Sequence, residues 1–191
     1  MRKTIAIAVA AAAFMVNAGS AQAFFNLLQP APQEQSSARA NVYETSPMPR
    51  ELVRFDADYA PGTVVVSTSE RSLYLVLPEK QAIRYGVGVG RPGFEWSGVH
   101  KVSRKAEWPD WRPPAEMLKR RPDLPRFMEG GEDNPLGARA LYLGSSIYRI
   151  HGSNEPNTIG QAVSSGCIRM TNEDVVDLYS RVKVGTKVVV L

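Results

Sequence analysis

Few residues in this chain could perform covalent chemistry, because it holds one cysteine, Cys167, and two histidines. Cys167 ends a Ser-Ser-Gly-Cys run, and one of the histidines, His151, precedes Gly152. A thiol that attacks a carbonyl carbon needs a base within hydrogen-bond reach and donors for the oxyanion that forms. His151 can be the base. The backbone N–H groups of Ser165, Gly166 and Cys167 can be the donors, since glycine lets the backbone approach a substrate closely.

A lone cysteine also admits other interpretations. It can form an intermolecular disulfide, or it can be a small buried hydrophobic residue without reactivity. The polar turn around Cys167 and the separate His-Gly pair favour a nucleophile, because reactive thiols lie in polar, partly exposed surroundings.

At this point the sequence resembles the signature of the L,D-transpeptidase catalytic domain, the YkuD-like family of bacterial cell-wall enzymes that includes the ErfK, YbiS, YcfS and YnhG types. The family pattern is His-Gly, a spacer, a glycine and then Ser-x-Gly-Cys-Ile-Arg. One departure is Ser165, where many members have a second histidine; only His151 matches the family's base. The matching segments are 151–152, 160 and 164–169, with further likeness at 96–98, 109–111 and 134–137.

The resemblance implies an enzyme that cleaves the bond after the third residue, a diamino acid, of a peptidoglycan tetrapeptide stem. Cys167 would form an acyl-enzyme and release D-alanine, with His151 as base and then acid. The backbone carbonyl of Gly152 would fix the imidazole tautomer. The acyl group would pass to an amine of another stem or of an outer-membrane protein. No metal or cofactor is implied.

Three further residues are candidates for substrate binding. Arg169 can hold a substrate carboxylate or brace the catalytic loop, with a surface ion pair as the alternative. Trp108 and Trp111 stand at the start of an unusual segment, and exposed aromatic rings suit sugars and peptide stems.

Two other functions remain open at the level of sequence. The same site could hydrolyse the bond, as an L,D-carboxypeptidase or endopeptidase with water as the acceptor. The chain could also be a non-catalytic module that binds the cell wall.

The first 23 residues have the pattern of a cleaved secretory signal. Arg2 and Lys3 precede an apolar run at 5–16, and an A-x-A site occupies 21–23. The run is short for a transmembrane helix, although an uncleaved anchor is the alternative. We therefore expect an exported, periplasmic or wall-associated protein without a stable membrane anchor. Cleavage would leave 21 basic and 19 acidic side chains, a balance that does not indicate nucleic-acid binding.

Residues 24–58 are predicted to be a disordered tether rich in Pro, Gln and Ser, and 59–191 the catalytic domain. Short β-branched runs separated by turns predict a mainly β, antiparallel sandwich-like fold. One helix is predicted near the C-terminus, starting with a capping box at Thr171 and ended by Gly185. Strands are expected at 63–67, 73–77, 82–89, 99–106, 140–143, 146–150 and 187–191.

The segment 109–135 is proline-rich and long, and connections of this length are usually functional. We hypothesise that it forms a lid or wall over Cys167, with one or two helical turns starting at Pro114. The alternative is an excursion on the surface. The second histidine, His100, has no companion ligands for a metal site and is interpreted as a strand residue.

Overall fold

The computed structural model describes residues 46–191. By its internal contacts the chain divides into two units, Met1–Asn41 and Val42–Leu191, and the described residues belong to the second. The predicted signal peptide at 1–23, and the predicted tether up to residue 45, lie outside the described residues. No helix between residues 46 and 191 is long and apolar enough to span a bilayer.

The predicted mainly β fold is confirmed in the described part of the chain, which holds a nine-stranded sheet in the order β1-β4-β3-β2-β11-β6-β7-β8-β10 and a two-stranded sheet, β5-β9. Most neighbours are antiparallel, but β2–β11, β8–β10 and β5–β9 pair in parallel. The strands are β1 (Glu51–Arg54), β2 (Val64–Ser67), β3 (Ser72–Leu77), β4 (Gln81–Gly86), β5 (Val89–Gly90), β6 (Gly98–Glu107), β7 (Arg139–Leu143), β8 (Arg149–His151), β9 (Ala162–Ser164), β10 (Ile168–Arg169) and β11 (Lys187–Val190).

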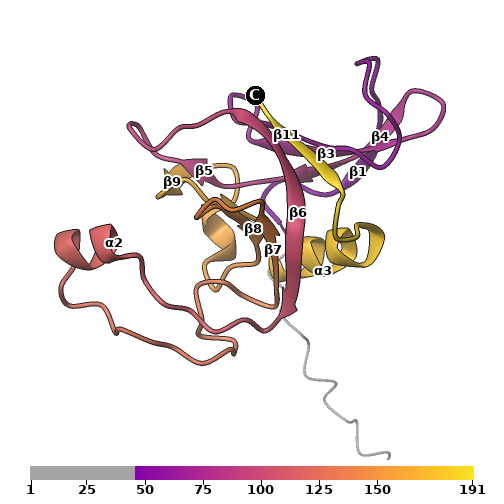
Figure 1. Cartoon of the computed structure of the whole chain (residues 1–191). Coiled ribbons are helices and arrows are strands. Elements are labelled where there is room, and N and C mark those ends of the chain that lie inside the picture. The colour runs from indigo at the N-terminus through magenta and orange to yellow at the C-terminus, as the bar shows by residue number, and fades with distance from the viewer. Residues whose placement is uncertain (1–45) are drawn as a thin grey trace, which may run out of the picture. The chain divides into compact units, whose positions relative to one another are not determined.

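Strand β6 connects the two halves of the large sheet, and Figure 1 shows it as a long curved strand. Its first residues pair with β11 and its later residues with β7, both antiparallel. The register shifts between Val102 and Arg104, which indicates a bulge; bulges bend a strand and increase its twist. The hydroxyl of Ser103, the residue between them, donates to the carbonyl of Gly144 at 2.8 Å. The bend allows β6 to pair with β11 in one half of the sheet and with β7 in the other.

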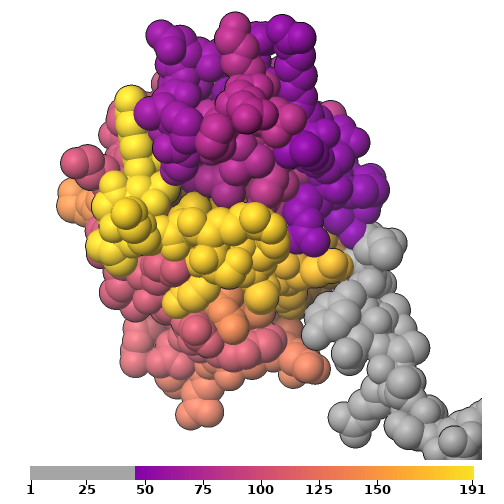
Figure 2. Space-filling view, turned by 90° about the vertical axis from the view of Figure 1, so that its right-hand side faces the viewer, coloured from indigo at the N-terminus to yellow at the C-terminus, as the bar shows by residue number. Residues whose placement is uncertain are grey.

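The core lies where the apolar faces of these strands meet helix α3 (Asn172–Arg181). Thr171 caps this helix, because its hydroxyl accepts a hydrogen bond from the N–H of Asp174 at 3.2 Å, as the capping box predicted. The helix ends at Arg181, before the predicted stop at Gly185. Figure 2 shows α3 and β11, both yellow, on one face of the molecule. The buried core includes Val64, Val66, Leu73, Leu75, Leu141, Leu143, Ile150, Val175, Leu178, Val188 and Val190.

The predicted tether extends too far towards the C-terminus. Strand β1 lies inside 24–58 and pairs with β4, with Leu52 opposite Ile83. An edge strand of four residues, two of them charged, carries little hydrophobic pattern, and its stability comes from pairing with β4. The predicted strand 82–89 is likewise divided into β4 and β5, and β8 is shorter than predicted.

The proline-rich segment contains helix α2 (Ala115–Arg120), which begins one residue after Pro114. The base of the segment is held by Asn134, whose side chain is almost completely buried. Its amide nitrogen lies within hydrogen-bond distance of the carbonyls of Pro109 (3.2 Å), Met128 (3.3 Å) and Glu129 (2.8 Å). Its amide oxygen accepts from the N–H of Leu136. One buried side chain therefore ties both ends of a long connection together.

We predict that Asn134→Ala lowers the free energy of unfolding by about 1–3 kcal/mol, the cost of leaving buried polar groups without partners. Urea denaturation measures this. Asn154→Ala is the matched control, because Asn154 also donates to a carbonyl of this segment, Asp133 O at 2.9 Å, but lies exposed. Equal losses in the two variants would contradict the role of burial.

Candidate active site

The parallel pairing of β8 with β10 brings the strand ends that carry the two predicted active residues, His151 and Cys167, to neighbouring positions. The register places Ile168 beside Ile150 and Arg169 beside His151, so Cys167, one residue before β10, comes next to Arg149. Parallel neighbours need a crossover of about a dozen or more residues. Residues 152–166 supply it, with the 3-10 helix η1 (Pro156–Thr158) and strand β9 on the way. The spacing between histidine and cysteine is thus a requirement of the topology.

The turn that carries Cys167 is fixed by a serine hydroxyl. Ser164 Oγ donates to the carbonyl of Cys167 at 2.6 Å and accepts from the N–H of Gly166 at 3.0 Å. Gly166 has a φ of +105°, which L side chains rarely adopt, and an added Cβ would stand 2.6 Å from the Tyr148 ring. Only glycine therefore fits here.

A stacked aromatic pair supports this turn from outside. The indole N–H of Trp96 donates to the carbonyl of Gly166 at 2.6 Å. The Trp96 ring stacks on Tyr148, with ring centroids 4.2 Å apart, and meets His100 edge-on at 5.4 Å. His100 is thus part of the packing around Trp96.

The set of available oxyanion donors is smaller than predicted. The Gly166 N–H is already engaged by Ser164 Oγ, so it is not free for a substrate. The N–H groups of Ser165 and Cys167 make no hydrogen bond within residues 46–191. These two remain as the candidate donors.

His151 is buried, and its Nδ1 lies 2.6 Å from the carbonyl oxygen of Gly152. A carbonyl can only accept, so Nδ1 carries the proton and Nε2 keeps its lone pair. Burial lowers the pKa of His151 to about 3, and the positive charges of Arg169 and Arg149 add to this effect. The imidazole is therefore neutral at physiological pH, in a tautomer that can accept a proton.

Cys167 is only partly exposed, and burial raises the pKa of its thiol. The charge of Arg149, and more weakly that of Arg169, lowers the pKa of Cys167 and opposes this effect. At rest the cleft consequently holds a thiol and a neutral imidazole. Charge separation must then occur during the reaction, where fixed dipoles and cations stabilise it most effectively.

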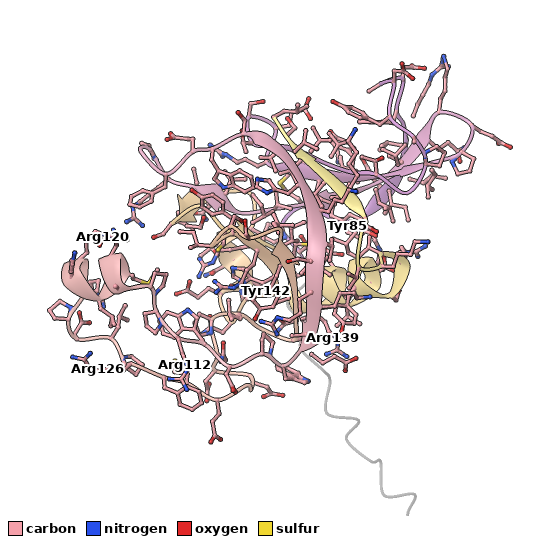
Figure 3. The ribbon with its side chains drawn as sticks, in the orientation of Figure 1. Tyr85, Arg112, Arg120, Arg126, Arg139 and Tyr142 are labelled. Carbon is pink, nitrogen blue, oxygen red and sulfur yellow. The ribbon has the colours of Figure 1, made fainter. Side chains whose placement is uncertain are left out.

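Cys167 and His151 both line one cleft of about 720 Å³. The proline-rich segment contributes residues to one side of this cleft. In Figure 3 Arg120, on helix α2 of that segment, lies well apart from Tyr142 in the sheet. The residues that this segment and its end contribute are Trp111, Pro114, Met117, Arg120, Arg121, Leu124, Pro135 and Leu136.

The predicted substrate-binding residues separate into two groups. Arg169 lines the cleft, and it also bonds Glu155 at 2.8 Å and the Thr158 hydroxyl at 3.3 Å, so it braces the crossover. Trp111 lines the cleft as well. Trp108 does not line it and is largely exposed.

Sequence reasoning missed two contributors to the site. Arg149 lines the cleft beside Cys167, and Tyr148 both lines it and limits the space at Gly166. The available signal was period-two alternation in β8, which places Arg149 and His151 on the same face of the strand. In the described part of the chain no group of three or more His, Cys, Asp or Glu side chains could bind a metal ion.

The model of the L,D-transpeptidase catalytic domain, called YkuD, matches residues 61–190. The chain belongs to this family. The match contains His151, Cys167 and the entire crossover between them. It begins after β1.

Two curated relatives carry the same family name. The chain is 39% identical over 135 residues to the probable L,D-transpeptidase ErfK/SrfK of Escherichia coli K12. This match covers 67% of this chain and 43% of ErfK/SrfK. It is 36% identical over 149 residues to the probable L,D-transpeptidase YbiS of the same organism. That match covers 74% of this chain and 47% of YbiS. The chain thus spans less than half the length of either relative.

Solved structures share the fold. A crystal structure named as a probable carnitine operon oxidoreductase from Brucella melitensis is 46% identical, with a TM-score of 0.52, and covers 79% of this chain and 99% of that one. L,D-transpeptidase 3 from Mycobacterium tuberculosis has a TM-score of 0.56 at 18% identity, covering 68% of this chain and 60% of that one.

The pKa of His151 predicts a flat pH profile for acylation of Cys167 by a β-lactam. With a pKa of about 3, the imidazole stays neutral from pH 5 to 7.5, so the rate constant changes less than about twofold. An imidazole with an ordinary pKa of about 6.5 would be almost fully protonated at pH 5, and the rate would fall about thirtyfold. Intact-mass kinetics across this range measures the difference.

His151→Ala is the comparison variant. Without a base, only the thiolate reacts, so its rate should rise about tenfold per pH unit below the thiol pKa. A wild-type profile that falls steeply below pH 6.5 would contradict the buried neutral imidazole.

Proposed function

We propose that this chain is an L,D-transpeptidase that acts on peptidoglycan tetrapeptide stems through an acyl-enzyme on Cys167. The observation that carries the proposal is the arrangement of the pair: a thiol and an imidazole fixed by Gly152 line the same cleft. The family membership and the names of the relatives support it. The oxidoreductase name of the Brucella structure belongs to that protein, whereas the matched domain and both curated relatives are named for L,D-transpeptidation.

In the first half-reaction the Cys167 sulfur attacks the carbonyl carbon of the diamino acid, and the thiol proton passes to His151 Nε2. The oxyanion accepts hydrogen bonds from the N–H groups of Ser165 and Cys167. The C–N bond then breaks, and His151 returns the proton to the nitrogen of the departing D-alanine. A thioester on Cys167 remains.

In the second half-reaction a neutral amine attacks the thioester carbon. Its proton passes to His151, the C–S bond breaks and the sulfur recovers the proton. The new amide is the product and the resting thiol pair is restored. An amine of another stem gives a cross-link between stems, and an amine of an outer-membrane protein gives an attached protein.

Hydrolysis is the competing outcome, because water can replace the amine. The segment 109–135 walls the cleft and is stiffened by prolines, which lowers the entropy lost when it orders over a substrate. Covering the acyl-enzyme limits the access of water. This favours transfer over the carboxypeptidase alternative.

Residues 1–23 are proposed to be a signal peptide that is removed before Phe24. The basic start, the apolar run and the A-x-A site support this. Export would bring the enzyme to its substrate, and the protein would act in the periplasm or at the wall.

We predict that the protein, incubated with a tetrapeptide stem and an amine acceptor, releases D-alanine and forms the transfer product. Without the acceptor, the acyl mass should accumulate on the Cys167 peptide. Mass spectrometry measures both products.

Cys167→Ala should remain folded and lose turnover, because it removes a single small side chain that supplies the covalent intermediate. Turnover by this variant would refute the mechanism. A tripeptide from hydrolysis as the main product, even with acceptor present, would favour the carboxypeptidase alternative.

A further inference from the structure

Arg149 is a cation beside the proposed nucleophile, and it has no carboxylate counter-ion among the residues that the structure describes. Its side chain lines the cleft together with Cys167 and His151. Among residues 46–191 its guanidinium forms no ion pair, and its Nε atom is buried without a hydrogen-bond partner. The guanidinium acts on the Cys167 thiol and lowers its pKa. Buried polar groups are normally hydrogen-bonded, and a partly buried charge without a counter-ion is costly. An anion bound in the cleft would remove this cost.

The guanidinium is held in position from the sheet. Arg149 stands opposite Tyr142 in the β7–β8 pairing, and Tyr142 stands opposite Arg104 in the β6–β7 pairing. Both guanidiniums lie on the Tyr142 ring, Arg104 at 3.6 Å and Arg149 at 5.2 Å from its centroid. Tyr142 belongs to β7, and Figure 3 shows it in the middle of the molecule. The orientation of Arg149 is therefore restrained, while its guanidinium has no carboxylate partner in the described residues.

The other arginines that line the cleft are paired with carboxylates or lie on an aromatic ring. Arg169 bonds Glu155, and Arg121 bonds Asp123. Arg91 and Arg120 both lie on the Phe94 ring, at 4.3 and 5.0 Å. Arg91 also lies 3.4 Å from the Ser165 hydroxyl, and Arg120 is exposed on α2. Among the cleft arginines of the described residues, Arg149 is distinguished by a guanidinium nitrogen that is buried without a hydrogen-bond partner.

We propose that Arg149 is a specificity residue that binds the α-carboxylate of the leaving amine and then the α-carboxylate of the acceptor amine. This inference rests on the proposed function, and it names what that function requires of the acceptor. The planar guanidinium can hold a carboxylate through two parallel hydrogen bonds.

One carboxylate site can bind the leaving amine in the first half-reaction and the acceptor amine in the second. The leaving group, D-alanine, is an amine with a carboxylate on the neighbouring carbon. The second half-reaction reverses the first in its bond changes, so the acceptor nitrogen occupies the position that the leaving nitrogen vacated. An acceptor with a carboxylate next to its amine can then bind Arg149 as D-alanine did. A lysine side-chain amine lacks this group, so the enzyme should prefer amino-acid-type amines.

The first test measures binding without turnover. Cys167→Ala protein is titrated with the tetrapeptide stem and with the same peptide carrying a C-terminal carboxamide. The expected affinity ratio is about tenfold or more in favour of the carboxylate, as for hydrogen bonds to charged groups. Adding Arg149→Gln should reduce the ratio to near one, and Arg149→Lys should leave an intermediate value. A ratio that Arg149→Gln does not change, or no preference at all, would overturn the proposal.

The second test measures acceptor choice in protein with Cys167 intact. Wild type should transfer the acyl group to D-methionine about tenfold faster than to D-methioninamide, and Arg149→Gln should abolish this preference. Arg104→Gln is the matched control, because it removes the other guanidinium from Tyr142 outside the cleft; it should keep the preference. If Arg149→Gln slows both acceptors equally, Arg149 acts on the thiol and not on the carboxylate.

The two levels of the proposal fail separately. If the carboxylate preference in binding depends on Arg149 but no D-alanine is released by wild type, the carboxylate site stands and the proposed function fails. If D-alanine is released but the binding ratio is independent of Arg149, the function stands and the assignment of Arg149 is wrong.

Discussion

The parallel pairing of β8 with β10 is the constraint on which the rest of the site depends. Two parallel neighbours cannot be joined by a tight turn, so the chain must leave the sheet after His151 and return before Cys167. The returning turn approaches the Tyr148 ring so closely that only Gly166 fits, and Ser164 closes the turn with its hydroxyl. The sheet therefore determines that the proposed base and the proposed nucleophile lie near each other, and the crossover only has to be long enough to join the two strands.

Burial then determines the resting state of the pair. It lowers the pKa of His151 and raises that of Cys167, so both are neutral before a substrate binds. Two arginines, Arg149 and Arg169, stand close enough to influence both groups, and Glu155 balances only Arg169. A cleft with an excess of positive charge suits a peptide that carries carboxylates. The same positive charge stabilises a thiolate and an oxyanion when they form, so the arginines that attract the substrate also stabilise the reacting groups.

Much of this could be predicted from residue types. The β-branched runs indicated most of the strands, the Thr171 capping box indicated α3, and the His-Gly and Ser-Ser-Gly-Cys motifs indicated the two active residues. Strand β1 was not predicted because its four residues show no alternation of apolar and polar side chains, and β9 and β10 are too short to show such a pattern.

The Gly166 N–H was expected among the oxyanion donors because the sequence does not show that the Ser164 hydroxyl accepts its hydrogen bond. Trp108 and Trp111 looked equivalent in sequence, and only the path of the chain separates them. Arg149 lay inside a predicted strand, where its place beside Cys167 depends on the β8–β10 register.

The claim that a buried, neutral imidazole with a free Nε2 serves the thiol can be tested most directly by nitrogen NMR of ¹⁵N-histidine-labelled protein, with His100→Gln to isolate the His151 signals. The account predicts a neutral ring protonated at Nδ1, unchanged from pH 7.5 down to pH 5. A doubly protonated ring at pH 7, or a neutral ring protonated at Nε2, would contradict it.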